Sequence, residues 1–170
     1  MSSFRESRDE LTGALNRTAL FSYLSDRVKD NANLSLICAN IDNMKHFNMH
    51  NGHRAGDDLL KRFVTIVKPL LGDNHALFRY GGDSFAIVLL NISQKEVLSL
   101  AQEICDISRQ KLSPPQLVDC GDPHCMGHAK ISVSIGVAES SPGMTSESIV
   151  QCAEKYLLKA KLAGRDRVCA

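Results

Sequence analysis

The chain has 170 residues, the length of one ordinary domain. Hydrophobic residues make up 44% and charged residues 23%, and 20 Lys plus Arg stand against 19 Asp plus Glu. This composition excludes a disordered chain and a strongly basic nucleic-acid-binding one, so any anion site must be local. No apolar run approaches the roughly 18 residues of a membrane span, and the beginning of the sequence does not resemble a signal peptide. We therefore expect a cytoplasmic protein with no membrane segment and no nucleic-acid partner.

Hydrophobic spacing predicts alternating helices and strands. The order favours an α/β (α+β) fold, in which helices flank a mixed central sheet of the ferredoxin-like or palm type. We expect one domain over 1–170, with 1–8 as a lead-in. The expected elements are a helix that follows a turn-rich stretch at 9–17 and ends by Asp30, a strand at 34–41, a helix from 58 to about 69, a hairpin at 76–90, a helix at 94–111, a strand at 131–137 and a helix at 146–163.

Two places in this order could carry chemistry. The hairpin turn Gly81-Gly82-Asp83 allows close approach of another group, although taken alone a simple bend is the favoured interpretation. Asn40 and Asp42 end the first strand, at an edge where ligands of α/β proteins often bind. Carboxylates from both places would form a site for Mg²⁺ and phosphates, but position 40 is an uncharged amide.

Five segments, in order, resemble the GGDEF family of diguanylate cyclases, which condense two GTP molecules into cyclic di-GMP. The hairpin Arg79-Tyr-Gly-Gly-Asp-Ser-Phe85 is similar to the signature that names the family. The resemblance implies the family's palm-type nucleotidyl cyclase fold. The other four segments are 9–17 (DELTGALNR), 40–57 (NIDNMKHFNMHNGHRAGD), 131–138 (ISVSIGVA) and 161–168 (KLAGRDRV).

The resemblance also implies roles for individual residues. Taken singly, these residues favour structural interpretations: Asn48 a turn, Asp57 a helix N-cap, and Lys161 with Arg165 a solvated helix end. In the family pattern Asn48 and Asp57 contact the guanine edge, and Asp83 binds metal and helps to activate the attacking hydroxyl. The remaining matches are Gly81 and Gly82 against the nucleotide, Lys161 and Arg165 near the phosphates, the backbone of Asn43, Met44 and Lys45 as a phosphate loop, and Asn40 with the Ile41 backbone at the metal site.

The sequence departs from the family pattern at the metal cluster. Asn40 and Ser84 replace two of its three acidic residues, and only Asp83 remains charged, although Asp42 could partly substitute. We therefore expect a degenerate domain that binds GTP or another guanine nucleotide, or a regulatory protein, within cyclic di-GMP signalling. The alternative is an active cyclase that works as a Mg²⁺-dependent homodimer. Gly72 and His75 occupy the positions of the Arg and Asp of the family's product-inhibition site, so no such site is expected.

Two cysteines and two histidines lie close together, at Cys120, His124, Cys125 and His128. They could bind Zn²⁺, because thiolates and imidazoles are its usual tetrahedral ligands. Their spacing differs from a standard zinc finger, and a surface loop with incidental Cys and His is the favoured interpretation.

Overall fold

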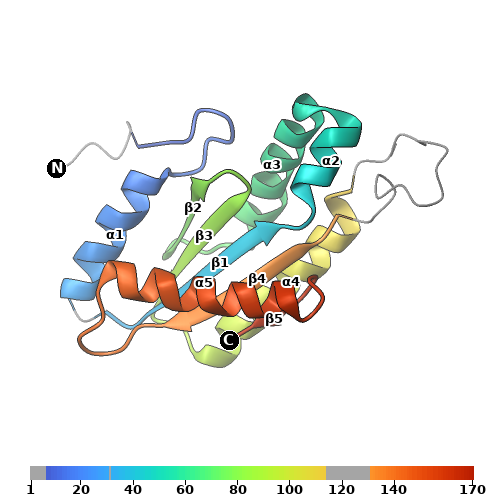
Figure 1. Ribbon diagram of the computed structural model, residues 1–170. Helices are drawn as coiled ribbons and strands as arrows, with labels where there is room; N and C mark the ends of the chain where they lie inside the picture. Colours follow the sequence, from blue (N-terminus) through green and yellow to red (C-terminus); the bar gives the residue numbers. More distant parts are fainter. Residues whose placement is uncertain (1–6, 31, 114–130) are drawn as a thin grey trace.

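The computed structural model describes residues 7–30, 32–113 and 131–170. Its centre is a five-stranded sheet in the order β2-β3-β1-β4-β5 (Figure 1). The pairs β2/β3, β3/β1 and β1/β4 are antiparallel and β4/β5 is parallel, so the sheet is mixed, and the predicted fold class is confirmed. The strands are β1 (Leu34–Ile41), β2 (His75–Gly81), β3 (Ser84–Leu90), β4 (Val133–Glu139) and β5 (Val168–Cys169).

Helices cover both faces of the sheet because the central strand is apolar on both sides. All eight residues of β1 are buried. Leu36 and Cys38 belong to one core, shared with α1 and α5, whereas Ile37 and Ala39 belong to the other, shared with α3 and α4. The helices are α1 (Arg17–Lys29), α2 (Met44–Asn51), α3 (His53–Val67), the 3₁₀ turn η2 (Lys68–Leu70), α4 (Gln94–Lys111) and α5 (Ser146–Leu162).

Three elements differ from the sequence prediction: α2, α3 and β5. The segment after β1 forms α2, and α3 begins at His53 instead of 58. The eight residues of α2 include two His and two Asn, which are weak helix formers, and only Met44 and Phe47 are buried, so no amphipathic pattern marks it. The two-residue β5 was too short to predict from periodicity. Within the described residues, none of the helices has the length and apolar character needed to cross a membrane.

The end of β1 lies beside the hairpin turn, and this contact positions the candidate site. The backbone N–H of Ile41 donates to the Asp83 carbonyl at 3.2 Å. In the sheet, Asn40 is opposite Ser84 on β3 and Ser134 on β4. The register therefore brings together residues that are more than 40 positions apart in the sequence.

Candidate functional site

A cavity of about 580 Å³ opens between the helix pair α2–α3 and the β2–β3 turn. Its volume is within the range of small-molecule sites. Six of the residues singled out from the sequence line it: Met44, Lys45, Asn48, Asp57, Gly82 and Asp83. The sequence did not single out the other four lining residues as site residues: Met49, His53, Leu60 and Arg79.

Asn48 and Asp57 face this cavity from two helices that meet at Gly52. The backbone N–H of Gly52 donates to the Asn48 carbonyl at 2.8 Å, and Gly52 adopts a φ of 82°. This left-handed conformation, which glycine adopts without strain, separates α2 from α3. Asn48 Oδ1 is buried and has no hydrogen-bond partner among the described residues. One wall of the cavity therefore carries two polar groups. They are the Asn48 carboxamide, whose oxygen has no hydrogen-bond donor among the described residues, and the Asp57 carboxylate.

The opposite wall is the hairpin turn, which is bonded to the end of β1 through Asn40. The side-chain amide Nδ2 of Asn40 lies 2.8 Å from Asp83 Oδ1, 3.3 Å from the Asp83 carbonyl and 3.2 Å from Ser84 Oγ. A carboxylate and a carbonyl only accept hydrogen bonds, so the donor end of the carboxamide must face them. The Asn40 side chain therefore positions Asp83 through hydrogen bonds between a neutral amide and the charged Asp83 carboxylate.

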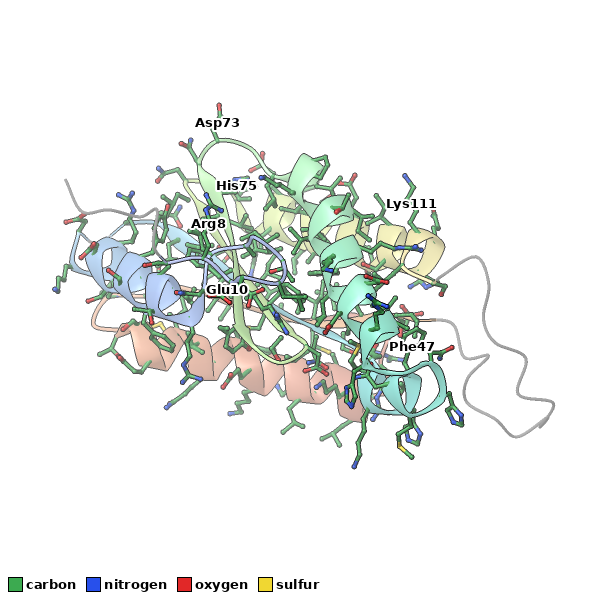
Figure 2. All side chains as sticks on the ribbon, turned by 90° about the horizontal axis from the view of Figure 1, so that it is seen from above. Arg8, Glu10, Phe47, Asp73, His75 and Lys111 are labelled. Carbon is green, nitrogen blue, oxygen red and sulfur yellow. The ribbon has the colours of Figure 1, made fainter. Side chains whose placement is uncertain are left out.

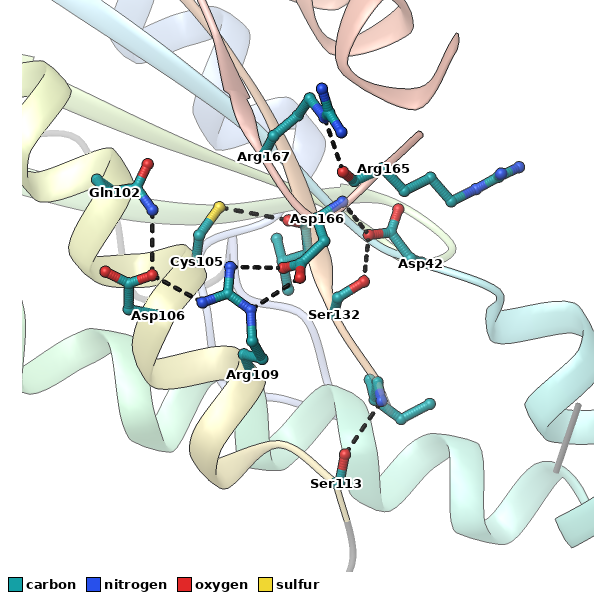
Figure 3. Close-up of polar contacts among 12 residues, drawn as sticks. Asp42, Gln102, Cys105, Asp106, Arg109, Ser113, Ser132, Arg165, Asp166 and Arg167 are labelled. Atoms are coloured by element: carbon teal, nitrogen blue, oxygen red, sulfur yellow. Dashed lines mark hydrogen bonds and ion pairs between the residues drawn. The ribbon is translucent and has the colours of Figure 1, made fainter. Parts of the chain in front are cut away.

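The Asp42 carboxylate bonds to β4 and to the residue that precedes this strand. Asp42 is 2% exposed, and its carboxylate accepts hydrogen bonds from the hydroxyls of Ser132 and Ser134, each at 2.7 Å. It also accepts one from the backbone N–H of Asp166 at 3.3 Å (Figure 3). Asp166 in turn forms a bidentate ion pair with Arg109 of α4, at 2.8 and 3.0 Å. Asp42 thus links the loop after β1 to the segment after α5.

Comparison with known proteins identifies the family. The sequence pattern described as "Diguanylate cyclase, GGDEF domain" matches residues 6–167. The chain belongs to the GGDEF diguanylate cyclase family. Among relatives, the diguanylate cyclase DgcS of Shewanella oneidensis is 30% identical over 93% of the chain, and VdcA of Vibrio cholerae is 29% identical over 94%. The chain spans 50% of the first relative and 45% of the second.

Solved structures agree with this assignment. The GGDEF domain of DgcB from Caulobacter crescentus, in complex with c-di-GMP, superposes with a TM-score of 0.83 at 26% identity. The alignment covers 97% of this chain and 95% of that domain. The diguanylate cyclase SiaD of Pseudomonas aeruginosa, in complex with its activator SiaC, superposes with a TM-score of 0.82 at 25% identity, over 97% of this chain and 62% of SiaD.

The residues around Asp83 do not fit the acidic Mg²⁺ cluster that the GGDEF resemblance implies. Mg²⁺ requires oxygen ligands in near-ideal octahedral geometry. Here the N–H groups of Asn40 are directed at Asp83 and Ser84, and the N–H of Ile41 also points to the turn. Asp42, the remaining nearby carboxylate, is bonded to two serines. No group of three or more His, Cys, Asp or Glu side chains in the described part of the chain is suited to a metal ion.

The residues expected near the phosphates come from two segments. Asn43 has a left-handed φ of 58° and starts α2, whose first residues are Met44 and the exposed Lys45. Lys161 lies in the last turn of α5 and Arg165 in the segment after it; neither lines the cavity, and Arg165 is exposed. The Asp42–Asp166 bond nevertheless brings the segment that carries Arg165 next to the loop after β1 (Figure 3).

Arg79 joins the hairpin turn to the start of the chain. Its guanidinium donates to the Gly82 carbonyl at 2.9 and 2.7 Å through Nε and Nη2, and to both oxygens of Asp9 at 3.0 and 3.1 Å through Nη1. Partial burial opposes ionisation of Asp9, but hydrogen bonds from Thr12 and Arg79 outweigh it and hold the pKa of this carboxyl below its ordinary value. The sequence placed Arg79 in the signature hairpin but gave no partner for its guanidinium.

Two remaining sequence predictions concern residues that do not line the cavity. One is on Gly72 and His75, at the positions of the family's product-inhibition site, and the other is on a Zn²⁺ site. His75 lies at the start of β2, near Arg8 and far from Phe47 of α2 (Figure 2). Its Nδ1 accepts the backbone N–H of Gly72 at 3.3 Å. The Cys120, His124, Cys125 and His128 segment, considered above for Zn²⁺, lies outside the described residues.

Proposed function

We propose that this GGDEF domain binds a guanine nucleotide and acts as a regulatory module in cyclic di-GMP signalling, without cyclase activity of its own. The observation that carries the proposal is the contact of Asn40 Nδ2 with Asp83 Oδ1 at 2.8 Å. It puts a neutral donor where phosphoryl transfer would need anionic ligands for a metal that neutralises developing charge.

The cavity supports nucleotide binding. The Asp57 carboxylate is a suitable acceptor for the N1–H and 2-amino donors of guanine, and the Asn48 carboxamide can both donate and accept. Lys45 and the backbone at the start of α2 would meet the phosphates. Lys161 and Arg165 would add charge-assisted hydrogen bonds from the neighbouring segment.

The alternative is an active cyclase that works as a Mg²⁺-dependent dimer. The persistence of Asp83, Asn48 and Asp57 around one cavity favours it. The two proposals differ in what Mg²⁺ does. A regulatory domain binds GTP equally well with and without the metal, whereas a cyclase needs it for binding and turnover. In the regulatory case, a protein partner or a second copy reads the nucleotide-bound state.

The test is calorimetric titration of the protein with GTP, once in Mg²⁺ and once in EDTA, paired with chromatography of the products. We expect similar affinity in both buffers and no cyclic di-GMP. The double variant Asn40→Asp/Ser84→Glu should gain Mg²⁺-dependent GTP binding, because three carboxylates would then surround the turn. Ser84→Gln, which has the same size without the charge, is the matched control. Steady production of cyclic di-GMP by the unmodified protein would establish the alternative, and no binding in either buffer would refute both.

A further inference from the structure

The segment that follows α5 has an unusual backbone at Gly164, Arg165 and Asp166. Their φ angles are 114°, 63° and 50°, all in the left-handed region. The helix end explains the first, because the Gly164 N–H donates to the Lys161 carbonyl and the Arg165 N–H to the Ala160 carbonyl, as in a Schellman cap. Aspartate tolerates the left-handed conformation, but arginine rarely adopts it. Such a strained residue persists only where its surroundings hold it.

Asp166 connects this backbone to two other parts of the fold. Its N–H donates to Asp42 Oδ2 at 3.3 Å. Its carboxylate accepts from Arg109 of α4, at 2.8 Å from Nε and 3.0 Å from Nη2 (Figure 3). A bidentate pair of this kind fixes orientation as well as distance. Arg109 Nη1 also donates to Asp106 at 2.9 Å, so the guanidinium is itself held against α4.

The Arg165 side chain is exposed and extends away from the Arg109–Asp166 ion pair, on the side where Asp42 lies (Figure 3). Within the described residues, no carboxylate forms an ion pair with its guanidinium. Asp42 comes directly after β1, the strand whose end is bonded to the hairpin turn of the cavity. An unpaired guanidinium beside this loop is suited to the anionic part of a ligand that the cavity holds.

We infer that Arg109 is a positioning residue for the phosphates of the bound nucleotide: through Asp166 it fixes the left-handed backbone that directs Arg165 toward them. The inference rests on the proposed guanine-nucleotide binding. Arg109 lies on α4 and does not line the cavity, so it acts only through another residue. Without the ion pair, Arg165 would relax to an ordinary φ and its side chain would change direction. The phosphate contact would then be lost while recognition of the base remained.

The test compares GTP with guanosine, which has the same base and no phosphates, by calorimetric titration in EDTA, with guanosine measured in competition against GTP. In Arg109→Ala we expect GTP affinity to fall about tenfold, the effect of one charge-assisted hydrogen bond, and guanosine affinity to change by less than about twofold. Lys111→Ala removes the same charge from an exposed position in the last turn of α4. It is the matched control and should leave both affinities unchanged.

A double-mutant cycle tests whether Arg109 acts through Arg165. Arg165→Ala should lower GTP affinity at least as much as Arg109→Ala, and combining the two should lower it no further. Asp166→Asn still suits a left-handed backbone but replaces the ion pair by a neutral acceptor, so GTP affinity should fall about threefold. This milder variant keeps the test valid if Arg109→Ala is unstable.

Three results would overturn the inference and leave the proposed function standing. They are equal losses for GTP and guanosine in Arg109→Ala, which would indicate a merely structural role, additive losses in the double variant, and unchanged GTP affinity in both Arg109→Ala and Asp166→Asn. If the unmodified protein binds neither GTP nor guanosine, the proposed function fails and this inference fails with it.

Discussion

Replacing Asp42 tests the link between the loop after β1 and the segment after α5. In Asp42→Ala, the hydroxyls of Ser132 and Ser134, which are 8% and 0% exposed, lose the carboxylate that accepts from them. Each buried donor left without a partner costs about 1–3 kcal/mol. The bond to the Asp166 backbone is lost as well. We therefore expect the free energy of unfolding to fall by about 3 kcal/mol.

Urea unfolding followed by circular dichroism measures this loss as a lower midpoint at unchanged slope. Asp42→Asn is the informative partner variant. It keeps one acceptor oxygen, and a serine hydroxyl can accept from its amide, so the loss should be about half as large. Asp58→Ala removes a carboxylate from an ion pair whose Asp58 side chain is 69% exposed, and should change stability by less than about 0.5 kcal/mol. A loss of under about 1 kcal/mol in Asp42→Ala would refute the reasoning.

Two further predictions use pKa directions. Because the pKa of Asp9 is lowered in the folded state, its ion pair with Arg79 stabilises the fold above the ordinary carboxyl pKa of about 4, and this contribution is lost as the pH falls through the lower folded value. Asp9→Asn should therefore cost about 1 kcal/mol at pH 7 and less as the pH falls toward 2, and an equal cost at both pH values in urea unfolding would contradict this. Burial raises the pKa of the Cys38 and Cys105 thiols to about 12. At pH 8, iodoacetamide should leave both unmodified until the protein unfolds, and rapid alkylation of either in the folded protein, seen by peptide mass spectrometry, would show that the thiol is accessible.

The sequence predicted the sheet and most helices because their apolar patterns are strong, a continuous apolar run in β1 and helical spacing in α4. It missed α2 because that helix buries only Met44 and Phe47 and is stabilised by tertiary contacts. The neutral residues at 40 and 84 were visible in the sequence. The sequence did not show that the Asn40 amide nitrogen points to Asp83, because this contact depends on the pairing of β1 with the hairpin.

Asp42 shows a second limit of prediction from the sequence. Its place at the end of the first strand, close to Asn40, suggested that it could partly substitute in a metal cluster. In the structure it lies just past the end of β1, where its carboxylate meets Ser132 and Ser134. These serines are about 90 positions away in the sequence, and their register against β1 is a long-range property that local patterns do not encode.

The Asn40–Asp83 contact also has a thermodynamic consequence. Two carboxylates at this distance would repel each other, and a turn built on them would depend on a bound cation for its position. An asparagine at position 40 removes the repulsion at every pH, and its hydrogen bonds hold β1 and the hairpin together without an ion. By linkage, the folding equilibrium of this domain should not shift with the concentration of free Mg²⁺. The wall of the cavity formed by the turn would then be in place before any ligand arrives, whatever the ionic conditions around it.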